Sequence, residues 1–451
     1  MFRLLLFLFV VASLSFAQAF AQASGNATAV PIGQAAVQNP APDTSAANPG
    51  GPSSEERMKA LEERIIALEG QLRQLQGSQQ AAAATTNVAA TAPPSQTTPI
   101  EPGQATEANT QLPVYGGATG MGKALNPDIS LIGDFLGAVG RNSVRPVPSM
   151  ELHETELGIQ AVVDPYARAD VFISFGETGV NVEEGFLTFT SLPAGLVARV
   201  GKMRAAFGKV NTLHNHVLPW TDRPLVTENL VGGEDGINDA GFSITRAFQA
   251  PKGIFLEATG QLFRGDSADV FKTVQKRDVS TVLHLRGYKD ISESTNLDLG
   301  VSFSRGHNDA GTGLLPQLQD SFLTHLYGVD ATVRWKPLRR SIYHSFVGRS
   351  ELIWSQRQQL PFEQRAFGMY ASGDYQLGRR WFVGARYDHS DRNREAFAVD
   401  KGGSVVLTYW PSEFAQLRAQ YRFTNYAAGI NANELRLQLQ FALGAHGAHP
   451  F

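Results

Sequence analysis

Apolar and polar residues alternate almost without error across residues 413–443 of this 451-residue chain. In the first of two segments, apolar residues from Ala415 to Phe423 interleave with Gln416, Arg418, Gln420, Arg422 and Thr424. In the second, Leu435 to Leu443 interleave with Arg436, Gln438 and Gln440. A period of two predicts β-strands with one apolar and one polar face. A sandwich buries its apolar face, whereas a membrane barrel turns that face to lipid and keeps arginine and glutamine in its lumen.

The same alternation of apolar and polar residues recurs in sixteen segments. Most of them are as long as the roughly 9 to 11 residues that a tilted membrane strand needs. The segments lie near 129–139, 150–163, 168–176, 181–191, 196–206, 238–248, 253–263, 278–288, 295–305, 322–336, 343–355, 364–376, 380–389, 402–411, 413–425 and 432–443. Tight turns rich in proline or glycine alternate along the chain with longer polar loops, as in such barrels. We therefore predict an all-β transmembrane antiparallel barrel of about sixteen strands within residues 128–451; merging one weak hairpin would give fourteen.

The region before the barrel has four parts. Residues 1–23 have the charge, apolar run and small-x-small site of a secretory signal peptide. Residues 24–52 are rich in Ala, Pro, Asn, Thr and Gly, and residues 78–127 in Ala, Thr, Pro and Gln; both lack periodicity, and we expect them to be disordered linkers. Residues 53–77 carry leucines at heptad spacing after a capping box, which predicts a short coiled-coil helix. This helix would hold a homotrimer together, or would lie alone on the barrel or on peptidoglycan.

Composition excludes several classes of protein. The chain has no cysteine, which removes thiol catalysis, cysteine-ligated metals and a disulfide-stapled scaffold. A net charge of −3 gives no support for a nucleic-acid partner. The sequence contains no Gly-x-Ser-x-Gly, no phosphate loop and no His-Glu-x-x-His motif, so we predict that the protein is not an enzyme and has no cofactor.

Alternation also predicts which charged residues face the lumen. Both signs are present, and arginine is concentrated in the later strands; the expected pore-lining set includes Arg334, Arg349, Glu351, Arg386, Arg418, Arg422 and Arg436, with Glu154, Glu156, Asp170, His284, Arg286, Asp298, Asp330, Asp374 and Asp388. Any water-filled barrel needs a polar lining. Opposed charges across a pore also set up a transverse field that selects solutes by charge and dipole. Arg418, Arg422 and Arg436 form the best candidate for an anion-attracting patch.

The longest predicted outer loop, residues 208–237, is the third, and we expect it to fold into the lumen as a constriction. Its candidate residues are Lys209, His214, His216, Asp222, Arg223 and Glu228, with Glu234 and Asp235. A His-x-His pair beside carboxylates could bind a divalent metal. Because such a pair alone is weakly specific, we expect it to fix the loop to the barrel wall, and we predict no metal. The same holds for His446 and His449 in the tail.

Residues 200–208 read VGKMRAAFG and residues 222–226 read DRPLV. These segments resemble the phosphate-selective porin O and P family, in which Gly-basic-x-x-x-x-Phe-Gly ends the strand before the third loop and an acidic-Arg pair follows. The resemblance implies a sixteen-stranded trimeric outer-membrane porin, often with a periplasmic coiled coil. Phosphate selectivity is not carried over, because this loop sets Lys209 and Arg223 against four carboxylates.

The functional prediction is an outer-membrane porin that passes small hydrophilic solutes by diffusion, with a preference for anions if the arginine patch acts. One alternative is a substrate-specific uptake channel for a metal complex or an oligosaccharide. Another is a structural or adhesive barrel whose coiled coil ties the outer membrane to the cell wall. The expected partners are outer-membrane lipid, further copies of the chain, peptidoglycan and, because Phe451 looks like its recognition signal, the barrel assembly machinery. The N-terminal region would be periplasmic.

Overall fold

The structure is a computed structural model that describes residues 127–177, 179–311 and 322–444. Sixteen strands form in this part of the chain, one for each predicted segment. They are β1 Asp128–Arg141, β2 Met150–Asp164, β3 Ala167–Gly176, β4 Gly179–Phe189, β5 Leu196–Arg204, β6 Asn238–Ala250, β7 Ile254–Phe263, β8 Ser280–Ser292, β9 Thr295–His307, β10 Leu323–Trp335, β11 Phe346–Arg357, β12 Gln364–Gly378, β13 Trp381–Asp391, β14 Val399–Ser412, β15 Ala415–Tyr426 and β16 Ile430–Gly444.

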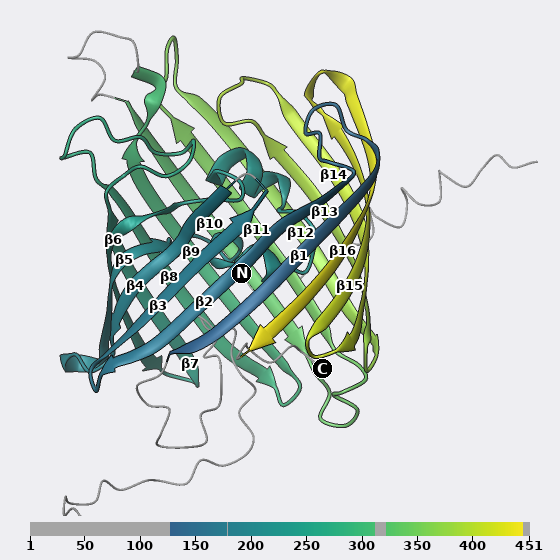
Figure 1. The fold of residues 1–451 in the computed structure, drawn as a ribbon. Helices are drawn as coiled ribbons and strands as arrows, with labels where there is room; N and C mark the ends of the chain where they lie inside the picture. Colours follow the sequence, from purple (N-terminus) through teal and green to yellow (C-terminus); the bar gives the residue numbers. More distant parts are fainter. Residues whose placement is uncertain (1–126, 178, 312–321, 445–451) are drawn as a thin grey trace, which may run out of the picture. The chain divides into compact units, whose positions relative to one another are not determined.

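The strands pair in order and antiparallel, and the sheet closes on itself (Figure 1). The closing pair joins β1 to β16, with Leu131 opposite Leu443 and Asp134 opposite Gln440. Closure leaves no free sheet edge, so every strand finds backbone partners on both sides. The predicted transmembrane-type barrel is confirmed, and the count is sixteen strands, not fourteen.

The outer face of the barrel is apolar and the inner face is polar. In β16, the leucines at 435, 437, 439 and 443 are exposed, whereas Glu434, Gln438 and Gln440 are buried. Leu437 is 49% exposed and the adjacent Arg436 only 8%. On the outer surface, Trp381 and Tyr409 stack on neighbouring strands with ring centroids 4.4 Å apart, close to the turn end of β13. Aromatic rings at this position are typical of the girdles that flank the apolar band of a membrane barrel.

Short turns join the strands at one end of the barrel and longer connections join them at the other (Figure 1). The turn between β2 and β3 is closed by Asp164, whose carboxylate accepts the Tyr166 N–H at 2.7 Å. The connection between β5 and β6 spans residues 205–237 and so begins three residues earlier than predicted. It contains three single turns, η3 Val210–Thr212, η4 Asn215–Val217 and η5 Thr227–Val231. We call residues 205–237 the inserted loop.

The inserted loop packs inside the barrel through an apolar cluster. Its side chains in the cluster are Ala205, Phe207, Val210, Leu218, Trp220, Val226, Leu230, Val231 and Ile237. They meet inward side chains from several strands, including Phe263, Val282, Leu326, Ile353, Tyr370 and Val406. Full burial of one such side chain is worth about 1.5–3 kcal/mol. The loop is therefore held against the wall formed by β7 to β14.

Asn211 joins the two ends of the inserted loop. Its amide donates to the carbonyls of Ala205 at 2.8 Å and Ile237 at 3.0 Å, and its side-chain oxygen accepts the Ile237 N–H at 2.8 Å. Gly236 has a φ of 61°, and a Cβ there would lie 2.1 Å from the Asn211 side-chain oxygen. A glycine is therefore required at position 236 beside the Asn211 side chain, both for backbone conformation and for space.

None of the helices in the described residues is long and apolar enough to span a membrane. The predicted signal peptide (1–23), linkers (24–52 and 78–127) and coiled-coil helix (53–77), and the tail with His446, His449 and Phe451, lie outside the described residues apart from position 127.

Candidate functional site

A cavity of about 220 Å³ lies between the inserted loop and the wall formed by β1, β2, β15 and β16. Its charged lining comes from both sides: Asp134, Arg145, Glu151, His153, Asp222, Arg223, Glu228, Glu234, Arg422 and Arg436. The opposite side of the loop is occupied by the apolar cluster. The polar seam between loop and wall is therefore the candidate passage, and we call it the charged seam.

Asp222 joins the inserted loop to two arginines of the barrel wall. Its Oδ2 lies 2.6 Å from Arg422 Nη1 on β15 and 3.0 Å from Arg386 Nη2 on β13. Its Oδ1 accepts the Gln420 amide at 2.5 Å. Burial alone would raise the pKa of Asp222, but Arg386 and Arg422 outweigh it and hold this pKa well below its usual range. The carboxylate is therefore ionised at neutral pH and compensates two inward guanidinium groups.

The other two arginines of the predicted patch have different partners. Arg418 donates to the Trp220 carbonyl at 3.1 Å and to the Gln438 side chain at 2.8 Å. Arg436 lies 3.4 Å from the Glu434 carboxylate on its own strand. Among the described residues, no carboxylate lies within 4 Å of Arg418. The three arginines do share one wall, but each is already engaged, and Arg418 lies beneath the loop.

The remaining predicted pore-lining residues lie nearer the turn end of the barrel or under the loop. Arg349 Nη1 is 2.5 Å from Asp374 Oδ2, and Arg334 Nη1 is 3.9 Å from Asp298 Oδ2. Glu351 faces the loop and not an open lumen: it accepts the N–H groups of Lys209 at 2.6 Å and Val210 at 2.7 Å.

Lys209 also reaches the wall, where its ammonium group pairs with Asp298. Burial lowers the pKa of Lys209, although Asp298 opposes that effect. Lys209 and Glu351 together fix the start of the inserted loop to β9 and β11.

Arg223 and Glu228, which the sequence places in the constriction, act mainly within the loop region. Arg223 donates to the carbonyls of Val210 at 3.0 Å and Leu213 at 2.7 Å. Burial lowers the pKa of Arg223 to about 10, so it is still a cation at neutral pH. Glu228 lies 3.4 Å from Arg145, which follows β1, and burial raises the pKa of Glu228. Both residues line the charged seam.

His214 and His216 enter a buried group of carboxylates on β2 and β4. His214 Nδ1 lies 2.7 Å from Glu156 Oε2 and 3.1 Å from Glu183 Oε2, while its Nε2 lies 2.8 Å from Glu184 Oε2. Burial would lower the pKa of His214, but Glu156, Glu183 and Glu184 raise it well above its usual value. With both ring nitrogens facing carboxylates, His214 is an imidazolium. It ties η4 to β2 and β4.

Two β-bulges supply residues to this region. Asp134 pairs with Glu154 and Phe135 with Leu152, so His153 is an extra residue in β2. Phe172 pairs with Glu184 and Ile173 with Val182, so Glu183 is an extra residue in β4. Glu183 and Glu184 are consecutive in the sequence, yet both are buried. A bulge redirects a side chain in this way. Strict alternation places only one of Glu183 and Glu184 on the inner face, and the bulge is what adds Glu183 to it. The expected pore-lining set includes neither glutamate, nor His153.

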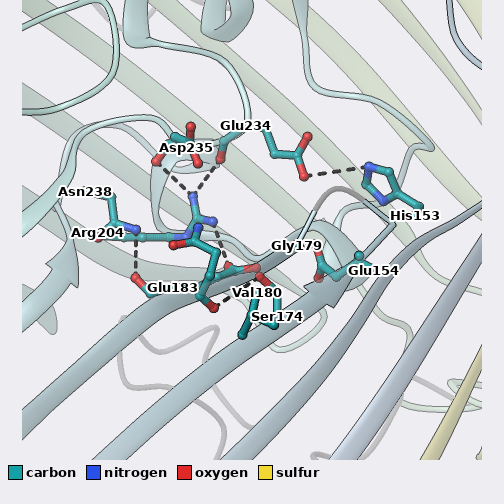
Figure 2. A pocket seen from close by; sticks show the side chains of 12 residues that line it. His153, Glu154, Ser174, Gly179, Val180, Glu183, Arg204, Glu234, Asp235 and Asn238 are labelled. Carbon is teal, nitrogen blue, oxygen red and sulfur yellow. Dashed lines mark hydrogen bonds and ion pairs between the residues drawn. The ribbon is translucent and has the colours of Figure 1, made fainter.

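Figure 2 shows the second cavity, of about 360 Å³, which opens beside the same carboxylates. Arg204 lines this cavity and donates to Glu183 Oε2 at 2.9 Å and to the backbone carbonyls of Glu234 and Asp235. On the other side, His153 Nε2 lies 3.7 Å from Glu234 Oε1. Three groups in this region have donor atoms close enough to hold a metal ion: Glu156 with His214 and His216, His153 with Glu154 and Glu234, and Glu154 with Glu156 and Glu183.

Comparison with known proteins finds no matching family model. An uncharacterized protein of Aquifex aeolicus (strain VF5) is 28% identical over 389 residues, which cover 73% of this chain and 81% of that protein. Among solved structures, a loop L8 deletion mutant of OmpT, an outer membrane protein of Vibrio cholerae, has 10% identity and a TM-score of 0.49, covering 71% of this chain and all of that one.

The outer membrane channel DcaP of Acinetobacter baumannii has 12% identity and a TM-score of 0.47, covering 70% of this chain and 96% of that one. OprB of Pseudomonas putida has 8% identity and a TM-score of 0.47, covering 72% and 95%. Because these sequence identities and TM-scores are low, the fold of this chain is assigned from its own strand pairing. Its function is argued from its own residues.

Proposed function

We propose that the protein is a bacterial outer-membrane porin that passes small hydrophilic solutes by passive diffusion. The observation that carries this proposal is a closed sixteen-stranded barrel with an apolar outer face and, inside it, a loop that leaves a charged seam along β1, β2, β15 and β16. Such a barrel satisfies its backbone in lipid and offers polar solutes a polar lining. The N-terminal region would lie in the periplasm, on the side of the short turns.

The narrower proposal concerns charge. Three of the four arginines of the seam are paired with acids: Arg422 with Asp222, Arg145 with Glu228 and Arg436 with Glu434. The fourth, Arg223, donates to the neutral oxygens of Val210, Leu213 and Asn215. Pairing reduces the net field of the arginines but leaves positive and negative groups on facing sides of the seam. We propose a weak preference for anions, and a selection among neutral solutes by dipole. Phosphate specificity is no part of this proposal.

Planar bilayer recording of the purified protein tests the main proposal. A porin gives discrete, ohmic conductance steps, and a trimer of barrels gives them in groups of three. A folded protein that inserts but passes no current would support the alternative of a structural barrel between outer membrane and cell wall. Strong block by one solute class at low concentration would support the substrate-specific uptake channel.

Reversal potentials in a salt gradient test the charge preference. The variant Arg418→Ala with Arg422→Ala removes two positive charges from the β15 wall, and we expect the anion preference of the wild type to fall or reverse. The control is Arg246→Ala, which removes an exposed arginine on the outer face of β6 and should leave the reversal potential unchanged. An unchanged reversal potential in the double variant would mean that these arginines are lining only.

A further inference from the structure

The strongest unexplained feature inside the barrel is the concentration of buried acids around η4. Glu154, Glu156, Glu183 and Glu184 are each at most 5% exposed. The described cations close to this group are Arg204, Arg199, whose charge interacts with that of Glu184, and the two imidazoles of the loop. Like charges so close together in a low-dielectric interior repel strongly unless a cation lies among them. With both imidazoles neutral, as metal binding requires, the four carboxylates exceed the two arginines by two charges, which is the charge of one divalent ion.

A second observation indicates what kind of cation fits. The Nδ1 of His216 is buried and has no hydrogen-bond partner, although it lies 3.4 Å from Glu156 Oε2. In a tetrahedral zinc site with bonds of about 2.0–2.1 Å, neighbouring donor atoms are about 3.3 Å apart. His216 Nδ1 and Glu156 Oε2 therefore have the separation of two zinc ligands, and His216 is directed at the shared space.

His214 is oriented as a metal-binding histidine would be. Its Nε2 lies 2.8 Å from Glu184 Oε2, which fixes the ring, and its Nδ1 is directed toward Glu156 and Glu183. In this structure Nδ1 lies at hydrogen-bond distance, 2.7 Å, from Glu156 Oε2, and zinc would take the place of the proton that these two atoms share. A carboxylate that holds the far nitrogen of a ligating histidine is the usual outer-shell arrangement at zinc sites. The donor atoms of Glu156, His214 and His216 all lie within 4.8 Å of one another.

The fourth position falls to one of two flanking acids, Glu154 or Glu183, whose donor oxygens lie within 4.8 Å of that of Glu156. Glu183 reaches this place through the β4 bulge. Both acids also line the cavity of Figure 2, which gives an ion a route from solvent.

We propose that the inserted loop is strapped to the barrel wall by a zinc ion held by His214, His216 and Glu156, with Glu154 or Glu183 completing the site. Two imidazoles with carboxylates form a donor set that suits a first-row divalent ion better than Ca²⁺ or Mg²⁺. The ion joins η4 to β2 and β4 and neutralises the acids that the bulge adds. The site is distinct from the charged seam, so it regulates the position of the loop and takes no part in selecting solutes.

The test is zinc titration of the untagged, folded full chain in detergent after treatment with a chelator, followed by calorimetry. We expect one Zn²⁺ per chain, and we expect the variants His216→Gln and Glu156→Gln each to weaken binding at least about tenfold. Two controls should bind as the wild type does: His284→Gln, a buried inward histidine bonded to Ser302, and His446→Ala with His449→Ala in the tail. Heat-dependent gel mobility reports that each variant is folded.

X-ray absorption at the zinc edge of the loaded wild type needs no variant. We expect nitrogen and oxygen neighbours at about 2.0–2.1 Å with imidazole scattering beyond them. The proposal is overturned if the wild type binds no zinc, if folded His216→Gln and Glu156→Gln both bind as tightly as the wild type, or if only the tail variant loses binding. The last result would mean that zinc is bound by the tail histidines alone. None of these outcomes bears on channel conductance, which is measured separately.

Discussion

Asp222 Oδ2 on the inserted loop lies 2.6 Å from Arg422 Nη1 on the barrel wall. The same oxygen is 3.0 Å from Arg386 Nη2, so one loop carboxylate compensates two inward arginines. Asp222→Asn removes the negative charge and keeps the size of the side chain. We predict a shift of the reversal potential in a salt gradient toward anion preference, because Arg422 loses its carboxylate partner beside the seam and Arg386 keeps only Asp388.

The control for that change is Asp235→Asn. Asp235 is an exposed acid of the same loop, and its backbone carbonyl, not its carboxylate, meets Arg204. A similar shift in both variants would show that the net charge of the loop acts at long range. An unchanged reversal potential in Asp222→Asn would mean that this ion pair does not lie on the conduction path.

The same carboxylate gives a dependence of stability on pH. Its pKa in the folded protein is well below the usual value of about 3.9, so folding favours the ionised form. The resulting stabilisation is present above about pH 4 and is lost as pH falls toward the lower folded pKa. The melting temperature of the wild type should therefore be higher than that of Asp222→Asn at pH 7. This difference in melting temperature should narrow progressively below about pH 4. A gap that widens on acidification would contradict the assignment.

Trp220 anchors the middle of the inserted loop. Its ring meets Tyr370 edge to face with centroids 5.3 Å apart and carries the Arg386 guanidinium 4.7 Å from its centre. Truncation of a buried tryptophan to alanine costs about 3–5 kcal/mol, and the loss here falls on the contact between loop and wall. We predict that Trp220→Ala raises single-channel conductance and its fluctuation while the barrel stays folded.

The matched control is Trp354→Ala, since Trp354 lies on the outer face of β11 against Phe367. It should leave conductance unchanged. Equal effects of the two tryptophans on conductance would mean that the barrel, and not the loop anchor, sets the width of the passage.

The parts of the fold that follow from side-chain alternation could be predicted from sequence. Leu437 and Arg436 face opposite ways because the pleat has a period of two, and the same rule placed the strands and the inward arginines. A bulge breaks that rule by one residue without a marker in composition. The inward positions of His153 and Glu183 therefore became visible only with the strand pairing.

Contacts of the inserted loop were also beyond sequence reasoning. His214 and His216 were recognised as a pair that could bind metal, and Glu156 as an inward residue of a strand about 60 residues away. Their approach depends on how the loop folds back into the barrel, which depends in turn on the apolar cluster around Trp220. Alternation specifies which face a residue occupies but carries no information about what lies opposite it across a lumen.

Glu351 provides a test of how the loop begins. Its carboxylate accepts the N–H groups of Lys209 at 2.6 Å and Val210 at 2.7 Å in a site without access to solvent. Glu351→Ala leaves two buried donors unsatisfied, at a cost of about 1–3 kcal/mol each, whereas Glu351→Gln keeps an acceptor oxygen. We predict a clear loss of thermal stability for the alanine variant and a smaller loss for the glutamine variant, measured as the temperature at which folded gel mobility is lost. Equal losses would indicate that the charge of Glu351, and not its two backbone hydrogen bonds, holds the loop in place.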